Sequence, residues 1–550
     1  MSAEDGSELT LGSMDSLQSL AANQAKLAAA ENSLEENEKA LGLEHKSTLD
    51  AANDLGNLYV EQGKLNEAEK MYRRALQGYE KTLGLDHLST LSAVNNLGIL
   101  CADQDKLAEA EKLYQRALKG KEKTFGRDHV TTLDTVQNLG NLYIKQGNLV
   151  KAGGVLLRAL QGYEKALGPE HQFTLDTVNS LGIVYMDLKK FDKAEKMYRR
   201  ALEGKEKTFG ADHTSTLSTV ENLGILYMTQ DRLAEAEDMC KRGLQGKEKT
   251  FGLEHKSTLS SAHNLANVYN DQGKLDEAEE LYLRALHGQE KLLGPDHTST
   301  LKTAQSLCSV YLAKRQLADA EEICRRTLQG YEKVFGPTHT LTLSTVNNLG
   351  LILKDQDKLA EAEEMFQRAL QEKEKTIGKE HISTLSTVNN LSSLYDAQGR
   401  PAEAEVMCRR ALEGYKRLLG PNHSATLGAV SNLGILCASQ DKLEEAEELY
   451  QYALRGFETT LGVEQTATFR PALNTLQNLG ELYKRQGKLD QAEEAFSKAL
   501  DGLQALFGPD HEICQRVTWR LLLLRSGESC DGPSIEGSSA GVGMNNTITD

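Results

Sequence analysis

Residues 87–126 read HLSTLSAVNNLGILCADQDKLAEAEKLYQRALKGKEKTFG and contain the pattern that decides the fold. Apolar residues recur at helical spacing on both sides of a short polar turn at Asp105, so the stretch predicts two amphipathic helices. Aspartate tolerates positive φ at such a turn, and Gly126 is the residue type that favours a left-handed cap at the end of a helix. The stretch therefore predicts a tight antiparallel helical hairpin.

The same pattern returns every 42 residues along the chain. An eleventh unit has Gln465 in place of the histidine that opens the others, and about four extra residues near 470–474 delay the next histidine to His511. A constant period of this length is typical of stacked supersecondary units. The ten evenly spaced histidines are His45, His87, His129, His171, His213, His255, His297, His339, His381 and His423.

Four positions hold the same residue type in all eleven units. A threonine, from Thr48 to Thr468, is predicted to cap the first helix. A glycine, from Gly84 to Gly508, is predicted to end the second helix. An alanine in the second helix, from Ala68 to Ala492, lets helices approach closely, and a leucine in the first, from Leu55 to Leu479, fills the space between neighbours.

The composition favours stacked helices and limits the possible partners. Of 550 residues, 39% are hydrophobic and 5% aromatic, with 8 prolines and one tryptophan, Trp519. The formal charge of −17 disfavours nucleic acid and anionic membranes, because phosphate binding needs clustered Lys and Arg. No apolar run approaches the ~20 residues that span a bilayer, and no signal-peptide pattern opens the chain. We expect a soluble, cytoplasmic protein.

The eight cysteines are predicted to be buried free thiols. Those within the repeats stand mostly where other units have Tyr or Phe, and Cys308 stands where most have glycine. At such core positions cysteine acts as a small apolar residue, so neither a disulfide framework nor a metal site is expected.

The chain resembles the tetratricopeptide repeat family through Leu55-Gly56, Tyr59, Ala68, Tyr72 and Ala75, a set that recurs to residue 499. The resemblance covers roughly residues 45–510, and the 42-residue spacing is similar to that of kinesin light chains. It implies an all-α, right-handed α-solenoid, or superhelix, of about eleven antiparallel helix-turn-helix units.

Two features of related proteins have no counterpart in the sequence. Kinesin light chains are expected to carry a long N-terminal heptad segment that pairs with the motor heavy chain, whereas residues 1–44 are expected to allow a helix of at most about 25 residues. The units also resemble fungal tandem-repeat arrays of nucleotide-binding immune-type receptors, yet no Gly-x-x-x-x-Gly-Lys-Ser/Thr sequence occurs. That second resemblance therefore implies a sensor array without its ATPase.

Four parts are predicted along the chain. Residues 1–44 form an N-terminal segment with a capping helix over 15–42, and residues 45–510 form the eleven units. Residues 511–525 form an apolar capping helix whose Trp519 can cover the last repeat. Residues 526–550 form a disordered Ser/Gly-rich tail.

The candidate binding surface is a stripe of six outward positions in each first helix. The family resemblance places first helices along a concave groove. In the second unit the six are Ser92, Asn95, Asn96, Ile99, Ala102 and Asp103. Asparagine dominates the stripe, and the predicted peptide-binding residues are Asn95, Asn96, Asn138, Asn179, Asn222, Asn264, Asn347, Asn348, Asn389, Asn390, Asn432 and Asn478.

The amide groups of this row allow two interpretations. An amide offers donors and an acceptor, so a row of them can bind the backbone of an extended peptide with little regard for its sequence. Alternatively, each asparagine bonds to the backbone of a neighbouring repeat and fixes the stacking. The six positions hold twelve acidic and five basic residues over eleven units. Neutral or basic segments should therefore be preferred.

No catalytic, cofactor or metal site is predicted. Helical layers lie ~8–10 Å apart, so equivalent histidines cannot share a zinc whose ligands must lie ~2 Å from it. The histidines are instead expected to bond to backbone near the next helix start. A Gly-x-Ser-x-Gly match at 537–541 lacks the strand and helix that a nucleophile elbow needs.

The sequence thus predicts a non-enzymatic scaffold or sensor that binds peptide segments or a partner domain in the groove and is monomeric without its partner. The alternatives are a self-associating structural array and a kinesin-light-chain-like cargo adaptor.

Overall fold

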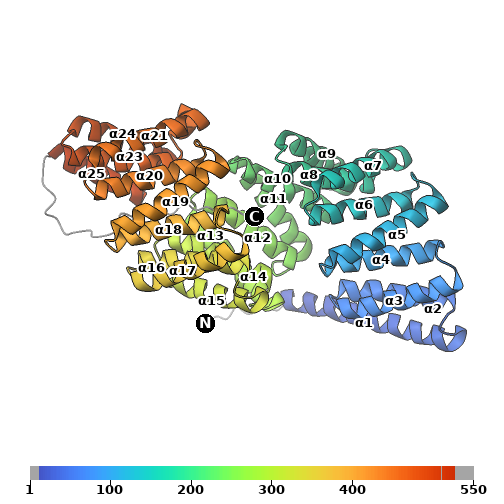
Figure 1. Cartoon of the computed structure of the whole chain (residues 1–550). Coiled ribbons are helices and arrows are strands. Elements are labelled where there is room, and N and C mark those ends of the chain that lie inside the picture. The colour runs from blue at the N-terminus through green and yellow to red at the C-terminus, as the bar shows by residue number, and fades with distance from the viewer. Residues whose placement is uncertain (1–10, 510, 527–550) are drawn as a thin grey trace, which may run out of the picture. The chain divides into compact units, whose positions relative to one another are not determined.

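The computed structural model describes residues 11–509 and 511–526, and the regular structure of those residues is entirely α-helical (Figure 1). The chain divides into two compact units, residues 1–268 and residues 269–550, which are described separately below. Within each unit the helices form consecutive antiparallel hairpins that stack in chain order. Each unit is therefore an all-α solenoid, as the sequence predicted.

The helices of unit 1 are α1 (Leu11–Leu41), α2 (Lys46–Glu61), α3 (Leu65–Thr82), α4 (Leu88–Asp103), α5 (Leu107–Phe125), α6 (Val130–Lys145), α7 (Leu149–Leu167), α8 (Gln172–Asp187), α9 (Phe191–Phe209), α10 (Thr214–Thr229), α11 (Leu233–Phe251) and most of α12 (Lys256–Asp271). Those of unit 2 are the end of α12 and then α13 (Leu275–Leu293), α14 (Thr298–Ala313), α15 (Leu317–Phe335), α16 (Thr340–Asp355), α17 (Leu359–Thr376), α18 (Ile382–Ala397), α19 (Pro401–Leu419), α20 (Ser424–Ser439), α21 (Leu443–Leu461), α22 (Val463–Thr466), α23 (Arg470–Arg485), α24 (Leu489–Phe507) and α25 (Glu512–Ser526). The even-numbered helices from α2 to α20, with α23, are the first helices of the hairpins; the odd-numbered ones from α3 to α21, with α24, are the second helices.

Each first helix except α23 begins directly after a histidine. His87 is the N-cap of α4, and its Nδ1 accepts a hydrogen bond from the Ser89 backbone N–H at 3.2 Å. The predicted bond from histidine to backbone at the helix start is thereby confirmed. Thr90 instead lies buried within the first turn, and its hydroxyl donates to the Gly84 carbonyl at 2.7 Å. The predicted threonine cap is therefore wrong, because this hydroxyl ties the helix back to the preceding glycine.

The predicted turn residues adopt the left-handed backbone that the hairpin needs. Gly126 ends α5 with φ of 90°, and Asp105 has φ of 61° in the turn between α4 and α5. In two hairpins without Gly or Asp at this turn, Lys189 and Arg315 take positive φ instead. Tertiary packing thus imposes the turn even where the residue type does not favour it.

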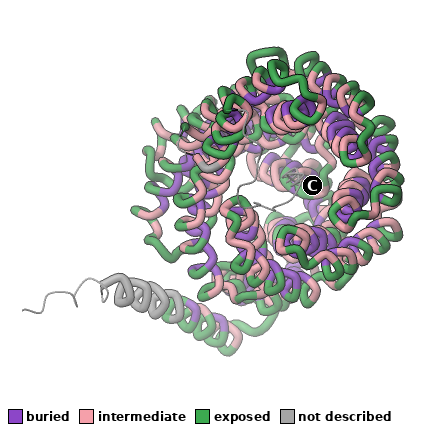
Figure 2. Tube along the Cα trace, turned by 90° about the vertical axis from the view of Figure 1, so that its left-hand side faces the viewer, coloured by how far each residue is buried: buried purple, intermediate pink, exposed green. Residues whose placement is uncertain are grey.

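Small residues and, in most hairpins, an aromatic ring form the core between the two helices. Figure 2 marks the buried residues along the Cα trace in purple. Ala194 and Tyr198 of α9 are both 0% exposed. A methyl group added to Gly182 of α8 would lie only 2.4 Å from Tyr198 Cε1, so the glycine makes room for the ring. This contact explains the recurring Leu-Gly and aromatic pattern of the sequence.

The cysteines of the described residues are free and buried, as predicted. Burial raises the pKa of the Cys101 thiol to about 11, which keeps the unreactive thiol form at neutral pH. Cys530 lies outside the described residues.

The extra residues of the eleventh hairpin lie before its first helix. They form α22 and the turn at 467–469, and not the predicted segment 470–474. Phe469 precedes α23 as N-cap, and Pro471 sits in the first turn, where a missing N–H costs no helical bond. Thr468 consequently lies exposed in the turn, and Ala472 takes the buried place of the threonine in other units.

Single helices close the two ends. Helix α1 begins at Leu11, earlier than the predicted residue 15, so its 31 residues exceed the predicted length, and it buries Leu27 and Leu34. Helix α25 buries Cys514, Val517 and Leu521, but Trp519 is 61% exposed. The expectation that Trp519 covers the last repeat is wrong, because the helical turn places it off the buried face. The predicted disordered tail lies outside the described residues, except for Ser526, which ends α25.

Rows of ion pairs connect successive second helices. Glu321 of α15 accepts from Lys358, which precedes α17, at 2.8 Å, and from Arg325 at 2.8 Å. The hydrogen bond from Lys358, with help from Arg325, lowers the pKa of Glu321 to about 2. Exposed pairs of this kind are each worth only about 0–1 kcal/mol, so the rows align the hairpins more than they hold them together.

Acid should remove the contribution of Glu321. A carboxyl whose folded pKa is depressed adds stability above its ordinary pKa of 4.5, and this stability disappears as pH falls toward about 2. We expect Glu321→Gln to reduce the fall in stability of the full chain over this pH window. Urea unfolding followed by circular dichroism at stepped pH measures it, and a pH profile identical to wild type would contradict the ion pair.

Candidate partner-binding surface

The first helices line the inner side of each unit. Within the part that the structure describes, and apart from α21 and α23, which only the short α22 separates, the most extensive contacts between helices that are not neighbours in the chain join first helices. They pair α4 with α6, α6 with α8 and α8 with α10 in unit 1, and α16 with α18, α18 with α20 and α20 with α23 in unit 2. We call the six outward positions of each first helix, those of Ser92, Asn95, Asn96, Ile99, Ala102 and Asp103 in α4, the first-helix surface.

The asparagines of this surface bond to one another between repeats. The Asn96 amide Nδ2 donates to Asn53 Oδ1 at 3.3 Å, so the second asparagine of one first helix reaches the first asparagine of the preceding helix. Asn390 donates to Asn347 in the same way at 3.1 Å. The remaining bonds of this kind are Asn138 to Asn95, Asn222 to Asn179 and Asn432 to Asn389.

These bonds combine features of both sequence interpretations. The asparagines do join neighbouring repeats, but their partner is a side chain and not the expected backbone group. Each bond uses one Nδ2 and one Oδ1, which leaves the other half of each amide for a further partner. Asn95 and Asn347 are only 8% and 9% exposed, so they are the least accessible of the predicted binding residues.

Three predicted binding residues stand outside this pattern. Asn264, Asn348 and Asn478 are partly buried and make no side-chain hydrogen bond to any residue that the structure describes. The preceding first helix has Glu221, Gln305 or Ser431 in place of the asparagine that would accept. Loss of these three amides would therefore leave the asparagine–asparagine bonds between repeats intact.

Several acidic groups of the surface are engaged in the core. The Tyr163 hydroxyl donates to Asp134 at 2.6 Å, and Asp176 pairs with the buried Lys205 at 2.8 Å. Glu221 pairs with the buried Lys247 at 2.5 Å. Most second helices thus carry Tyr or Lys at one buried position, and an acid on the first helix satisfies it in these pairs.

Another set of acids remains exposed in unit 1. Asp54, Glu61, Asp103 and Asp187 lie on α2, α4 and α8, and no cation lies within 4 Å of them among residues 11–509 and 511–526. Lys145, on the same surface, is 3.6 Å from Asp105. Unit 1 therefore presents a net negative first-helix surface, and the preference for neutral or basic segments stays a prediction.

The first-helix surface of unit 2 has mixed charge. Lys354 of α16 donates to the Ser393 hydroxyl at 3.0 Å, and the Ser439 hydroxyl donates to Asp396 at 3.3 Å. Burial lowers the pKa of Lys354 and raises the pKa of Asp396, so both charges are partly desolvated.

The repeat pattern did not reveal that some lysines of the second helices are buried. Lys205 and Lys247 are 2% and 5% exposed. The available signal was the exchange of Lys for Tyr at one position of the second helix, as in Lys121 and Tyr163.

The described ranges also bear on metal binding and on membrane insertion. No cluster of three or more His, Cys, Asp or Glu side chains there could hold a metal ion. No helix in the same part of the chain combines the length and apolarity that a membrane span needs.

Family models described as tetratricopeptide repeat match most of the chain. One model matches residues 27–81, 47–123, 86–165, 130–207, 174–249, 301–375, 343–407, 383–459 and 471–521, and a second matches 258–299. No curated protein matches the chain.

Solved structures with partial similarity include three helical proteins. BtubC (BKLC) from P. vanneervenii is 23% identical, with 42% of this chain and 91% of that chain covered and a TM-score of 0.35. A structure of TPR-like repeats, which are nearly identical to one another, from a putative kinesin light chain of Podosopora anserina is 26% identical to this chain. It covers 38% of this chain and 98% of that chain, with a TM-score of 0.34. The apo form of RapI is 15% identical, with 52% and 98% covered and a TM-score of 0.41.

Proposed function

Because this chain belongs to the tetratricopeptide repeat family, whose members serve in general as protein-interaction scaffolds, we propose that it binds a partner protein along the first-helix surface. The partner supplies an extended segment or a domain, and the contacting segment is neutral or basic. The chain itself is monomeric until the partner binds.

The observation that carries this proposal is the acidic row of unit 1. Asp103 is exposed beside Ile99, which is 38% exposed, and beside asparagine amides with unused hydrogen-bonding groups. An extended peptide offers backbone groups to the amides, an apolar side chain to Ile99, and a Lys or Arg to Asp103. A carboxylate clamp for acidic tails would need unpaired cations here, and Lys145 already lies beside Asp105.

The test uses the full chain and three labelled synthetic peptide pools of equal length, one acidic, one neutral and one basic. We expect fluorescence anisotropy to show the tightest binding with the basic pool and the weakest with the acidic pool. Asp54→Asn/Asp103→Asn should weaken basic-pool binding about tenfold, equivalent to about 1.4 kcal/mol.

A matched control removes two charges elsewhere. Asp128→Asn/Asp192→Asn changes two exposed acids of the interhelix loop and a second helix, and it should leave binding unchanged. Equal losses in both double variants would show a non-specific charge effect and defeat the proposal. Tightest binding of the acidic pool would defeat it as well.

The asparagine row is tested with its three unbonded members. Asn264→Ala/Asn348→Ala/Asn478→Ala should weaken peptide binding while the thermal midpoint stays that of wild type. A normal affinity in this variant would leave the row with the stacking role alone.

The first alternative is self-association. A hollow of about 400 Å³ lies between α1 and α2, where Ala30, Ser33 and Asp54 line the end of unit 1. A helix of a second copy would fill it if the array stacks end to end. Light scattering at several concentrations separates the two functions, because a growing mass without partner supports stacking and a constant monomer mass supports the scaffold. A kinesin-light-chain-like cargo adaptor is a narrower form of the scaffold, with a transported protein as its partner.

A further inference from the structure

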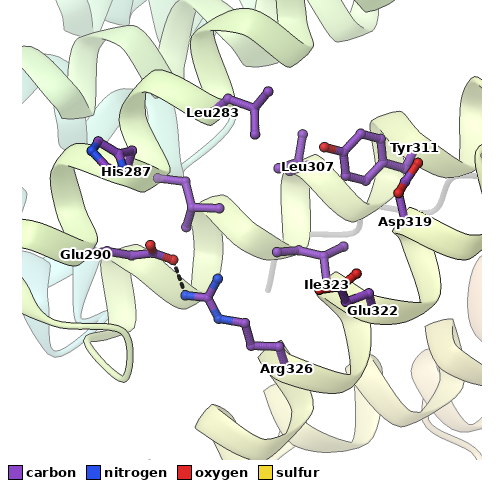
Figure 3. Close-up of a pocket in the computed structure, with 10 residues that line it drawn as sticks. Leu283, His287, Glu290, Leu307, Tyr311, Asp319, Glu322, Ile323 and Arg326 are labelled. Atoms are coloured by element: carbon purple, nitrogen blue, oxygen red, sulfur yellow. Dashed lines mark hydrogen bonds and ion pairs between the residues drawn. The ribbon is translucent and has the colours of Figure 1, made fainter.

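A second hollow lies in unit 2, away from the first-helix surface (Figure 3). It has a volume of about 330 Å³ and lies between the second helices α13 and α15, with α14 at its base. Leu283 and Leu286 of α13, Ile323 of α15, and Leu307 and Tyr311 of α14 supply its apolar lining. We call it the α13–α15 hollow.

Leu283 departs from the pattern of its position. Leu283 is 43% exposed, whereas most other second helices carry Arg, Lys or Gln there. In α3 the equivalent Arg73 pairs with Glu69 four residues earlier, at 2.8 Å, and with Glu109 of the next second helix, at 2.9 Å. Arg325 and Arg409 make the same two kinds of contact in unit 2.

The exchange of arginine for leucine has two consequences. The apolar lining stays uncovered at the Leu283 end of the hollow, because the leucine carries no guanidinium that would extend toward α15, whereas Arg326 reaches Glu290 at the other end. In addition, Asp319 has no arginine to pair with. It lies 36 residues after Leu283, just as Glu109 lies 36 residues after its partner Arg73. Asp319 is exposed, and no cation lies within 4 Å of it in the part of the chain that the structure describes.

The rest of the rim is also acidic. Glu322 lines the hollow without a cationic partner among the described residues, whereas Glu290 is paired with Arg326. Figure 3 shows Asp319 beside Tyr311, at the opposite end of the hollow from His287 and Glu290. Burial raises the pKa of the Tyr311 hydroxyl, with Glu279 and Asp319 adding to the shift, so the hydroxyl remains a neutral donor.

We propose that the α13–α15 hollow binds a short segment of a partner protein in which a large apolar residue is next to Lys or Arg. The apolar side chain fills the space over Leu286 and Ile323, and the cation takes the place of the missing arginine at Asp319. This site is separate from the first-helix surface and would let the chain hold two proteins at once.

The chain contains a natural control for this arrangement. Leu157 of α7 occupies the position of Leu283 and is 42% exposed. The residues around Leu157 differ from those around Leu283. Gly153 occupies the position of Glu279, and Lys193 occupies the position of Asp319. Leu157 therefore presents the apolar group without the acid.

The test probes the full chain with three labelled peptides of equal length in a Gly/Ser background, which carry a central Leu-Arg, Leu-Gln or Ala-Arg. We expect the Leu-Arg peptide to bind most tightly by fluorescence anisotropy. Leu283→Arg restores the residue of other repeats, so the fold should be kept while binding falls at least about tenfold. Asp319→Asn should remove the advantage of Leu-Arg over Leu-Gln.

Two controls separate this site from the rest of the chain. Leu157→Arg should leave Leu-Arg binding unchanged, because Leu157 has Lys193 and not an acid at the position that corresponds to Asp319. The Asp54→Asn/Asp103→Asn variant weakens binding to the first-helix surface, so adding Leu283→Arg to that variant should still lower the affinity for the Leu-Arg peptide. No saturable binding of the Leu-Arg peptide up to about 1 mM would overturn the proposal, as would equal affinity in wild type and Leu283→Arg. Loss only in the Asp54→Asn/Asp103→Asn variant would place the peptide on the first-helix surface and also overturn it.

Discussion

Tyr198→Ala is expected to lower the free energy of unfolding of unit 1 by about 3–5 kcal/mol, the usual cost of removing a buried aromatic ring. The Tyr198 ring is 0% exposed and packs on Gly182, so its loss leaves a cavity in the centre of the α8–α9 hairpin. Urea unfolding followed by circular dichroism measures the loss, and hydrogen exchange locates it in α8 and α9. A change below about 1 kcal/mol would contradict the packing described here.

Tyr198→Phe is the matched control. The Tyr198 hydroxyl is buried and has no hydrogen-bond partner, so its removal should be neutral or stabilising. Tyr72→Phe should instead cost about 1 kcal/mol, because the Tyr72 hydroxyl donates to Asn57 Oδ1 at 2.6 Å. Equal effects of the two hydroxyl deletions would contradict this difference.

Glu221→Ala is expected to cost about 3–5 kcal/mol, because it leaves the charge of Lys247 buried without its partner. The two side chains are 15% and 6% exposed, and Glu221 also accepts a hydrogen bond from the Ser261 hydroxyl. Chemical unfolding of the full chain measures the loss in the free energy of unfolding, and amide hydrogen exchange of α10 and α11 shows where it occurs.

Glu221→Gln/Lys247→Tyr should restore most of that stability. This double variant copies a pair present elsewhere in the chain, in which the Tyr331 hydroxyl donates to Gln305 Oε1 at 3.1 Å across the same sequence separation. A double variant as unstable as Glu221→Ala would show that the ion pair is not the source of the loss.

The repeat pattern was sufficient to predict the helices, the hairpin turns and the buried thiols. Each of these depends on local geometry, such as the positive φ of Asp105, or on one position that is buried in most units, such as that of Cys101. Family membership, predicted from Leu55-Gly56 and its companions, is confirmed by models that match from residue 27 to residue 521 with short gaps.

The errors concern residues whose partner depends on three-dimensional packing. Threonine and histidine both lie near the start of a first helix, and the sequence does not tell which of them meets the free N–H groups. Trp519 belongs to an apolar helix, but the side of α25 that is covered depends on how the preceding hairpin ends.

The candidate site could be located but not fully described from the sequence. Asparagines at two adjacent positions were visible, yet the bond from Asn96 to Asn53 requires the one-residue offset with which successive first helices pack. Leu283 was visible as an exception to a polar position, but its meaning depends on Asp319, which only the stacking of second helices brings near.

The central claim, that partners bind along the first-helix surface, is tested most directly by hydrogen–deuterium exchange of the full chain with and without the basic peptide pool. Binding there predicts slower exchange in α2, α4 and α8, which carry Asp54, Asp103 and Asp187, and unchanged exchange in the second helices α3, α5 and α9. Protection confined to the second helices, or no protection at saturating peptide, would contradict the account.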